Sequence, residues 1–230
     1  MPRARSTIQA DWQTAAPQEN GSGCLSLYSL SILSVFLITC LITALALNTP
    51  VKISAASPNQ PASSTHQLSP IFTREVQHWA DAITRWANAS ALDPNLVAVI
   101  MQIESCGDPS ARSSAGAMGL FQVMPFHFQL GENSYDPEIN ALRGLNYLTR
   151  SLQAANGDAR LALAGYNGGI GVISRGEWSW HAQTKRYVYY GAPIYADARS
   201  GATTSPMLDE WYRKYGAGLC RDASQKLGLN

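Results

Sequence analysis

The chain has 230 residues and a formal net charge of +1 at pH 7, with 17 Lys and Arg residues against 16 Asp and Glu residues. Charged residues make up 14% of the sequence, which is below the share of about 25% that is usual in soluble domains. This balance excludes the strongly basic surface of a nucleic-acid-binding protein, so we expect no nucleic-acid partner. The length suffices for one globular domain with additional segments.

The N-terminal part contains three segments of different composition. Residues 1–23 have mixed charge and no hydrophobic periodicity, which predicts a disordered tail. Residues 24–47 contain no charged residue and are long enough to cross a hydrocarbon core of about 30 Å, which predicts a transmembrane helix or signal anchor. Residues 48–69 contain three prolines among small polar residues and predict a flexible linker, so that the folded domain is expected at residues 70–230.

The apolar segment has two interpretations. We prefer an uncleaved, single-pass membrane anchor, because a cleavable signal has a shorter apolar core of roughly 7 to 15 residues. The alternative is a protein secreted after cleavage, since Ala44, Leu45 and Ala46 fit a small-residue cleavage site.

Outside the apolar segment the cysteines are Cys106 and Cys220. In an oxidising compartment such a pair is expected to close a disulfide, and two free buried thiols are the alternative that the sequence leaves open. The four histidines are scattered without the spacing of metal ligands, so we expect no metal site and no cofactor.

Hydrophobic periodicity predicts a mainly helical domain, because apolar residues recur every three or four positions and no convincing alternation with period two is present. The predicted helices cover residues 72–86, 94–104, 137–152, 159–164, 181–190 and 206–212. Asp93, Asp136, Asp158 and Ser205 precede four of these helices and are predicted N-caps.

Glu104 is the only carboxylate in the second predicted helix and stands at its C-terminal end. The helix dipole and the apolar neighbours both disfavour the ionised form there, and a protonated carboxyl is what a general acid needs. The alternative is an ordinary solvated residue at a helix end.

Four separated stretches form a recognisable pattern. They are Ile-Glu-Ser at 103–105, Gly-Leu-Phe-Gln-Val-Met-Pro at 119–125, Ala-Gly-Tyr-Asn-Gly at 164–168 and Gln-Thr-Lys-Arg-Tyr-Val at 183–188. In this order they resemble the signature of the soluble lytic transglycosylase catalytic domain (SLT, goose-lysozyme-like), a family of enzymes that cut peptidoglycan. The resemblance covers about residues 72–195. The sequence departs from the family pattern at Gln183, where glutamate is usual, and at Gly165, where alanine is common.

The resemblance implies a lysozyme-like helical fold for the domain, with peptidoglycan glycan strands as the substrate. It implies that Glu104 is the catalytic acid and base. The residues that it places in the saccharide cleft are Ser105, Gln122, Met124, Tyr166 and Asn167.

Glycoside hydrolysis usually requires two carboxyl groups, whereas the motif stretches contain only Glu104. Asp108 follows closely, but its neighbouring glycine and proline predict a solvated turn. We therefore expect a non-hydrolytic reaction in which the substrate's own N-acetyl group replaces the second carboxyl group and the product ends in 1,6-anhydroMurNAc. Tyr166 is expected to donate a hydrogen bond to Glu104.

Two other functions fit the same residues. A peptidoglycan or chitin hydrolase of lysozyme type would activate a water molecule in the same cleft, and a non-catalytic glycan-binding module would keep the fold without the reaction. The Gln183 departure leaves the binding module open, whereas the intact Glu104-Ser105 pair argues against it. Since peptidoglycan lies outside the cytoplasmic membrane, we expect the catalytic domain outside the cytoplasm.

Overall fold

The computed structural model describes residues 68–229 of the chain. The predicted tail, the apolar segment at 24–47 and most of the predicted linker lie outside these residues. Within the described part, no helix has the length and apolar character needed to cross a membrane. Leu68 and Ser69, the first residues described, are buried.

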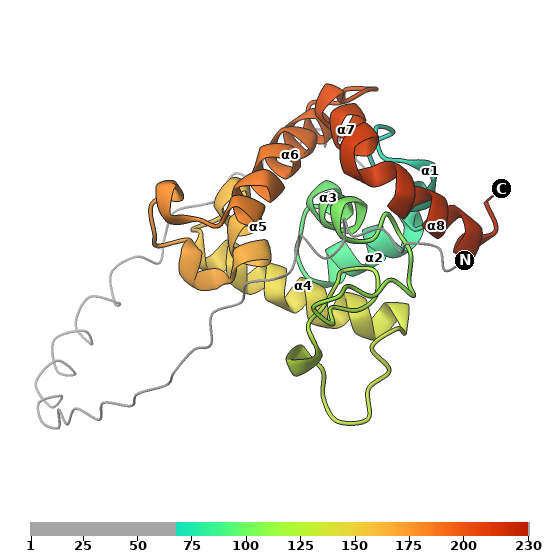
Figure 1. Ribbon diagram of the computed structural model, residues 1–230, viewed down its shortest axis with the longest axis horizontal. Helices are drawn as coiled ribbons and strands as arrows, with labels where there is room; N and C mark the ends of the chain where they lie inside the picture. The colour runs from blue at the N-terminus through green and yellow to red at the C-terminus, as the bar shows by residue number, and fades with distance from the viewer. Residues whose placement is uncertain (1–67, 230) are drawn as a thin grey trace, which may run out of the picture. The chain divides into compact units, whose positions relative to one another are not determined.

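The described residues are mainly helical, as predicted (Figure 1). The α-helices are α1 (Arg74–Gln77), α2 (Ala80–Ala89), α3 (Pro94–Glu104), α4 (Pro137–Ala154), α5 (Ala159–Gly168), α6 (Ala182–Arg199), α7 (Pro206–Trp211) and α8 (Ala217–Leu227). Shorter helical turns are η2 (Pro125–His127), η3 (Ile170–Val172), η4 (Glu177–Ser179) and the π-helical η5 (Tyr212–Gly216). Extended pairing in the described part is limited to isolated bridges between residues 112 and 118 and between 118 and 123.

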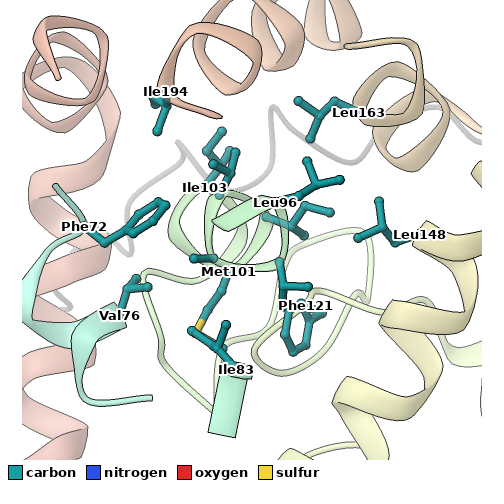
Figure 2. Packing of buried hydrophobic residues seen from close by; sticks show 14 of the residues in the cluster. Phe72, Val76, Ile83, Leu96, Met101, Ile103, Phe121, Leu148, Leu163 and Ile194 are labelled. Carbon is teal, nitrogen blue, oxygen red and sulfur yellow. The ribbon is translucent and has the colours of Figure 1, made fainter. Parts of the chain in front are cut away.

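Helix α3 lies at the centre of the domain (Figure 1). Every residue from Leu96 to Glu104 is buried, and α3 contacts α1, α2 and α6. Figure 2 shows its side chains surrounded by Ile83 of α2, Leu148 of α4, Leu163 of α5 and Ile194 of α6. A helix that is apolar on all sides is stable only when other elements cover all sides, so α3 is the core helix of this fold.

The four predicted N-caps are confirmed. The side chain of Asp93 accepts a hydrogen bond from Asn95 N at 2.8 Å, and Asp136 caps α4 in the same way. Asp158 and Ser205 cap α5 and α7 by accepting from the backbone nitrogen three residues later. Each cap satisfies a backbone N–H that has no partner within its helix, which places the start of each helix.

The first predicted helix is wrong in one respect, because it is broken into α1 and α2. The break lies at Trp79, whose indole nitrogen donates to the carbonyl oxygen of Gly107 at 2.9 Å. Gly107 has a φ of +85°, and a Cβ there would lie 2.8 Å from the carbonyl oxygen of Glu75. The loop after α3 therefore lies close against α1, and its hydrogen bond with Trp79 coincides with the break between α1 and α2.

Cys106 and Cys220 form a disulfide that joins the residues after α3 to α8, as predicted. Helix α8 is also held by Glu75 of α1, whose carboxylate accepts hydrogen bonds from the Ser224 hydroxyl and from Arg74 Nε. Burial by itself raises the pKa of Glu75, but these hydrogen bonds outweigh burial and lower that pKa below its ordinary value. The C-terminal helix is thus fastened to the start of the domain beside the end of α3.

Candidate active site

Glu104 is the last residue of α3, and only 7% of its surface is exposed. The chain turns away at once, since Cys106 has a φ of +51° and is held by the disulfide. Between them, Ser105 is fully buried, and its hydroxyl donates to Leu120 O at 2.7 Å and accepts from Gly107 N at 3.0 Å. Ser105 was expected to line the cleft, but its buried hydroxyl instead holds the neighbouring loop through these two hydrogen bonds.

Two tyrosines from different helices face Glu104. Burial raises the pKa of Tyr187 well above its ordinary value, and the charge of Glu104 and a hydrogen bond to Glu104 raise it further. Burial also raises the pKa of Tyr166 strongly, with the charge of Glu104 as the next cause. Both phenols therefore stay protonated at physiological pH and remain hydrogen-bond donors beside the carboxyl group.

The structure corrects the predicted role of Tyr166. Its hydroxyl donates to the carbonyl oxygen of Phe121 at 2.8 Å, whereas a hydrogen bond to Glu104 is among the causes that raise the pKa of Tyr187 of α6. Tyr187 belongs to the motif at 183–188, but the sequence analysis assigned it no role. The sequence predicted a helix at residues 181–190, but not which of its side chains turns inward.

Beside Tyr166 lies a cavity of about 90 Å³. It brings together four of the five residues that the sequence analysis placed in the cleft, and they are Gln122, Met124, Tyr166 and Asn167. The cavity is further lined by residues that the sequence analysis did not assign to the site, including Phe126, His127, Gly144 and Tyr147. The motif stretches at 119–125 and 164–168 thus meet in space although they are about 40 residues apart in the sequence.

The segment that carries Gln122 is held rigidly. Gln122 has a φ of +46°, and its side-chain nitrogen donates to Gly119 O at 2.9 Å and to Ala111 O at 3.2 Å. From α4, the buried side chain of Asn140 accepts from Phe121 N at 2.9 Å and donates to Met118 O at 2.7 Å. Asn140 was not identified from the sequence, because a single amide in a helix carries no signal of the loop that it clamps.

These observations agree with comparison to known proteins. Residues 81–188 match the family described as Transglycosylase SLT domain. We refer to the domain that contains this match as the SLT domain. The matched range contains Glu104, Gln122, Tyr166 and Tyr187, and it ends before α7 and α8.

Two curated relatives support this assignment. The chain is 40% identical over 111 residues to "Transglycosylase" of Enterobacteria phage PRD1, covering 47% of this chain and 40% of the relative. It is 31% identical over 87 residues to "Membrane-bound lytic murein transglycosylase E" of Buchnera aphidicola subsp. Acyrthosiphon pisum, covering 32% of this chain and 39% of the relative. The chain thus spans about two fifths of the length of these relatives.

Among solved structures, an inactive mutant of the lytic transglycosylase Slt from Pseudomonas aeruginosa aligns with a TM-score of 0.38 at 23% sequence identity. The alignment covers 64% of this chain and 24% of that chain.

An aromatic row extends from the SLT domain's cavity towards the surface. Ring centroids are 5.8 Å apart between Tyr166 and Tyr147, 4.8 Å between Tyr147 and His127, and 4.5 Å between His127 and Phe126, which is 68% exposed. Burial, and secondarily the charge of Arg150, lowers the pKa of His127, so the imidazole is neutral at physiological pH. A row of this kind offers apolar faces edged with hydrogen-bonding groups, which suits a ligand with both characters.

Two further carboxylates near Glu104 have structural roles. Asp108 accepts hydrogen bonds from the backbone nitrogen and the hydroxyl of Ser110, each at 2.8 Å, so the predicted turn is confirmed although the side chain is buried rather than solvated. The Glu75 carboxylate lies within 4.8 Å of the sulfur atoms of Cys106 and Cys220. Because these sulfurs are joined in a disulfide, they are not thiolates and offer no ordinary metal ligands.

Proposed function

We propose that this SLT domain cleaves the glycosidic bond between MurNAc and GlcNAc in peptidoglycan without consuming water, and leaves 1,6-anhydroMurNAc ends. The observation that carries the proposal is the buried carboxyl group of Glu104, faced by the neutral phenols of Tyr166 and Tyr187 in the matched family region. The names of the two curated relatives, a transglycosylase and a lytic murein transglycosylase, support the same reaction.

The reaction uses one carboxyl group twice. Glu104 first protonates the oxygen between MurNAc and GlcNAc, and the bond from that oxygen to C1 of MurNAc breaks while the N-acetyl carbonyl oxygen stabilises C1. The resulting carboxylate then takes the proton of the C6 hydroxyl, and O6 bonds to C1. Glu104 ends protonated as it began, so no cofactor and no second protein carboxylate is needed.

The residues described around Glu104 fit a reaction that uses a single carboxyl group. No Asp or Glu is among the described residues that line the adjacent cavity, so these residues offer a hydrolytic water no second carboxylate as a base. Tyr187 holds the carboxyl group in position and stabilises the carboxylate that forms after the first proton transfer. Gln122, Met124 and Asn167 form walls of the cleft in this proposal, and Asn167 is oriented by a hydrogen bond from Thr184 at 3.1 Å.

The test is mass spectrometry of the fragments that the purified protein releases from peptidoglycan. We expect products with anhydro ends, and we expect Glu104→Gln to abolish them while the protein stays folded and still sediments with peptidoglycan. Glu138→Gln, at an exposed carboxylate at the start of α4, is the matched control and should retain activity.

The other outcomes decide between the remaining functions. Products with reducing ends would mean that water is consumed and that the protein is a hydrolase. Retained binding to peptidoglycan with no product from the unmodified protein would identify a glycan-binding module, as the Gln183 departure allows. Near-normal turnover of Glu104→Gln would reject Glu104 as the acid.

We further propose that residues 24–47 anchor the protein in the cell membrane with the SLT domain outside the cytoplasm. The disulfide supports this side of the membrane, because disulfides persist in oxidising compartments. Protease added to cells with a permeabilised outer envelope should degrade the SLT domain. A protein that is soluble and shortened at its N-terminus would instead indicate secretion after cleavage.

A further inference from the structure

Phe126 is an exposed aromatic residue at the outer end of the aromatic row. It is 68% exposed, and it also lines the cavity beside Tyr166. A single exposed aromatic side chain is normal on a protein surface. Phe126 differs because its ring, 4.5 Å from that of His127, continues a series of ring contacts that ends at Tyr166, on which the charge of Glu104 acts.

The segment that carries Phe126 is held in place on both sides of this residue. Pro125 is the first residue of η2, and Phe128, directly after η2, packs against the hydrophobic core. Farther along the same loop, the Glu132 carboxylate accepts a hydrogen bond from Arg143 Nε of α4 at 2.9 Å and a second one from Arg143 Nη2. A ring that such a segment presents to solvent loses little conformational freedom when a ligand covers it.

The described residues that line this cavity are uncharged. Their side chains are aromatic, amide, thioether and aliphatic groups together with the imidazole of His127, which is neutral because burial lowers its pKa. Arg150, whose charge also acts on His127, lies over the Tyr147 ring at 5.8 Å from the ring centroid and is not among the lining residues. A neutral ligand with an apolar face and a polar edge therefore fits this lining better than a carboxylate does.

We propose that Phe126 stacks on one sugar ring of the bound glycan strand, at a position outside the two rings that are joined by the bond that is cut. The inference rests on the proposed function for the identity of the strand. A GlcNAc or MurNAc ring has a face of C–H groups that can pack on an aromatic ring while its polar groups stay at the edge. Two rings, those of His127 and Tyr147, stand between Phe126 and Tyr166 in the row, so the sugar on Phe126 lies away from Glu104.

This position makes Phe126 a residue that binds the strand and takes no part in the chemical step. The sugar ring that it covers does not change during the reaction, so the contact stabilises the bound substrate and the transition state equally. The contact should therefore lower KM and leave kcat unchanged.

The first measurement is calorimetric titration of the full-length Glu104→Gln protein with a peptide-free octasaccharide of alternating GlcNAc and MurNAc. Because binding is measured without cleavage, the result does not depend on the proposed reaction. Adding Phe126→Leu removes the ring but keeps an apolar side chain, and it should weaken binding about five- to tenfold, whereas Phe126→Tyr keeps the ring and should stay within about twofold. Trp178→Leu is the matched control and should leave the affinity unchanged, because it removes a ring that is 86% exposed and does not line this cavity.

The second measurement is cleavage of the same octasaccharide by the protein with Glu104 intact. Phe126→Leu should raise KM by a similar factor while kcat stays unchanged. The midpoint of urea unfolding should also stay unchanged, since Phe126 is mostly exposed. A merely structural role would instead lower the midpoint and would not separate leucine from tyrosine.

The proposal is overturned if the octasaccharide does not bind, if Phe126→Leu binds it as tightly as Trp178→Leu does, or if Phe126→Tyr is as weak as Phe126→Leu. A defect that appears only with strands still carrying their peptides would also overturn it, because the ring would then hold the peptide. Release of anhydro products with an unchanged KM in Phe126→Leu would reject the sugar contact alone. Weakened binding in Phe126→Leu, with no product from the unmodified protein, would reject the proposed reaction alone.

Discussion

Removal of the Cys106–Cys220 disulfide should strongly destabilise the SLT domain. The bond closes a loop across a sequence separation of 114 residues. The chain-entropy relation gives a loop of this length a stabilisation of about 5 kcal/mol, and removal of a native disulfide from a small domain typically costs about 2 to 5 kcal/mol. Since single domains are stable by about 5 to 15 kcal/mol in total, the bond provides a large fraction of the stability.

The assay is urea unfolding of the unmodified protein and of a Cys106→Ala/Cys220→Ala double variant, each with and without reductant. With a slope of about 2 kcal/mol per molar urea, the midpoint should fall by about 1 to 2.5 M in the double variant. Reductant should lower the midpoint of the unmodified protein to a similar value and leave the variant unchanged. Activity should fall as well, because Cys106 holds the loop that follows Glu104.

A double variant that unfolds within about 1 kcal/mol of the unmodified protein would refute this reasoning. It would mean that α8 is held mainly by the hydrogen bonds between Glu75, Arg74 and Ser224. The disulfide would then add little to the stability that those hydrogen bonds already provide.

Three other predictions concern the site and its support. Tyr187→Phe removes the hydrogen bond to Glu104 and should lower kcat/KM roughly 10- to 100-fold in a muropeptide-release assay, with little change in the unfolding midpoint. Equal rates would exclude a role of Tyr187 in positioning the Glu104 carboxyl group. Gly144→Ala places a methyl carbon 2.7 Å from the Phe121 Cβ and 3.1 Å from the Tyr166 hydroxyl oxygen, so these side chains must shift. The variant should lose about 1 to 3 kcal/mol in urea unfolding and part of its activity; unchanged stability and activity would contradict this reasoning. The pKa of Glu75 is lowered in the folded state, so its ionised form stabilises the fold above the ordinary pKa of 4.5, and this stabilisation is lost as the pH falls below that value. The difference in unfolding free energy between the unmodified protein and Glu75→Gln should therefore shrink in acid. A difference that grows in acid would contradict the lowered pKa.

The sequence predicted the start of a helix correctly where the signal lies in the residues next to that start. Asp93 and Asp136 precede a proline at the first helical position, and both helices begin there. Helix α6 was predicted to end at residue 190 but continues to Arg199 through Pro193, because its packing against α3, α5 and α7 outweighs the local signal. The break at Trp79 has the same origin, since it depends on a loop 28 residues away.

The sequence by itself determined that a helix ends in Glu104, because apolar residues recur at helical spacing after an N-cap and a single carboxylate stands at the end. The structure decided that this helix is buried. The resemblance of the sequence motifs to a family indicated Gln122, Met124, Tyr166 and Asn167 as cleft residues, and the structure brings these four to one cavity. Only the tertiary structure decided that Tyr187 rather than Tyr166 bonds Glu104 and that Ser105 is buried. Which side chains meet depends on how helices far apart in the sequence pack around α3, and the direction of a side chain follows from that packing rather than from its neighbours in the chain.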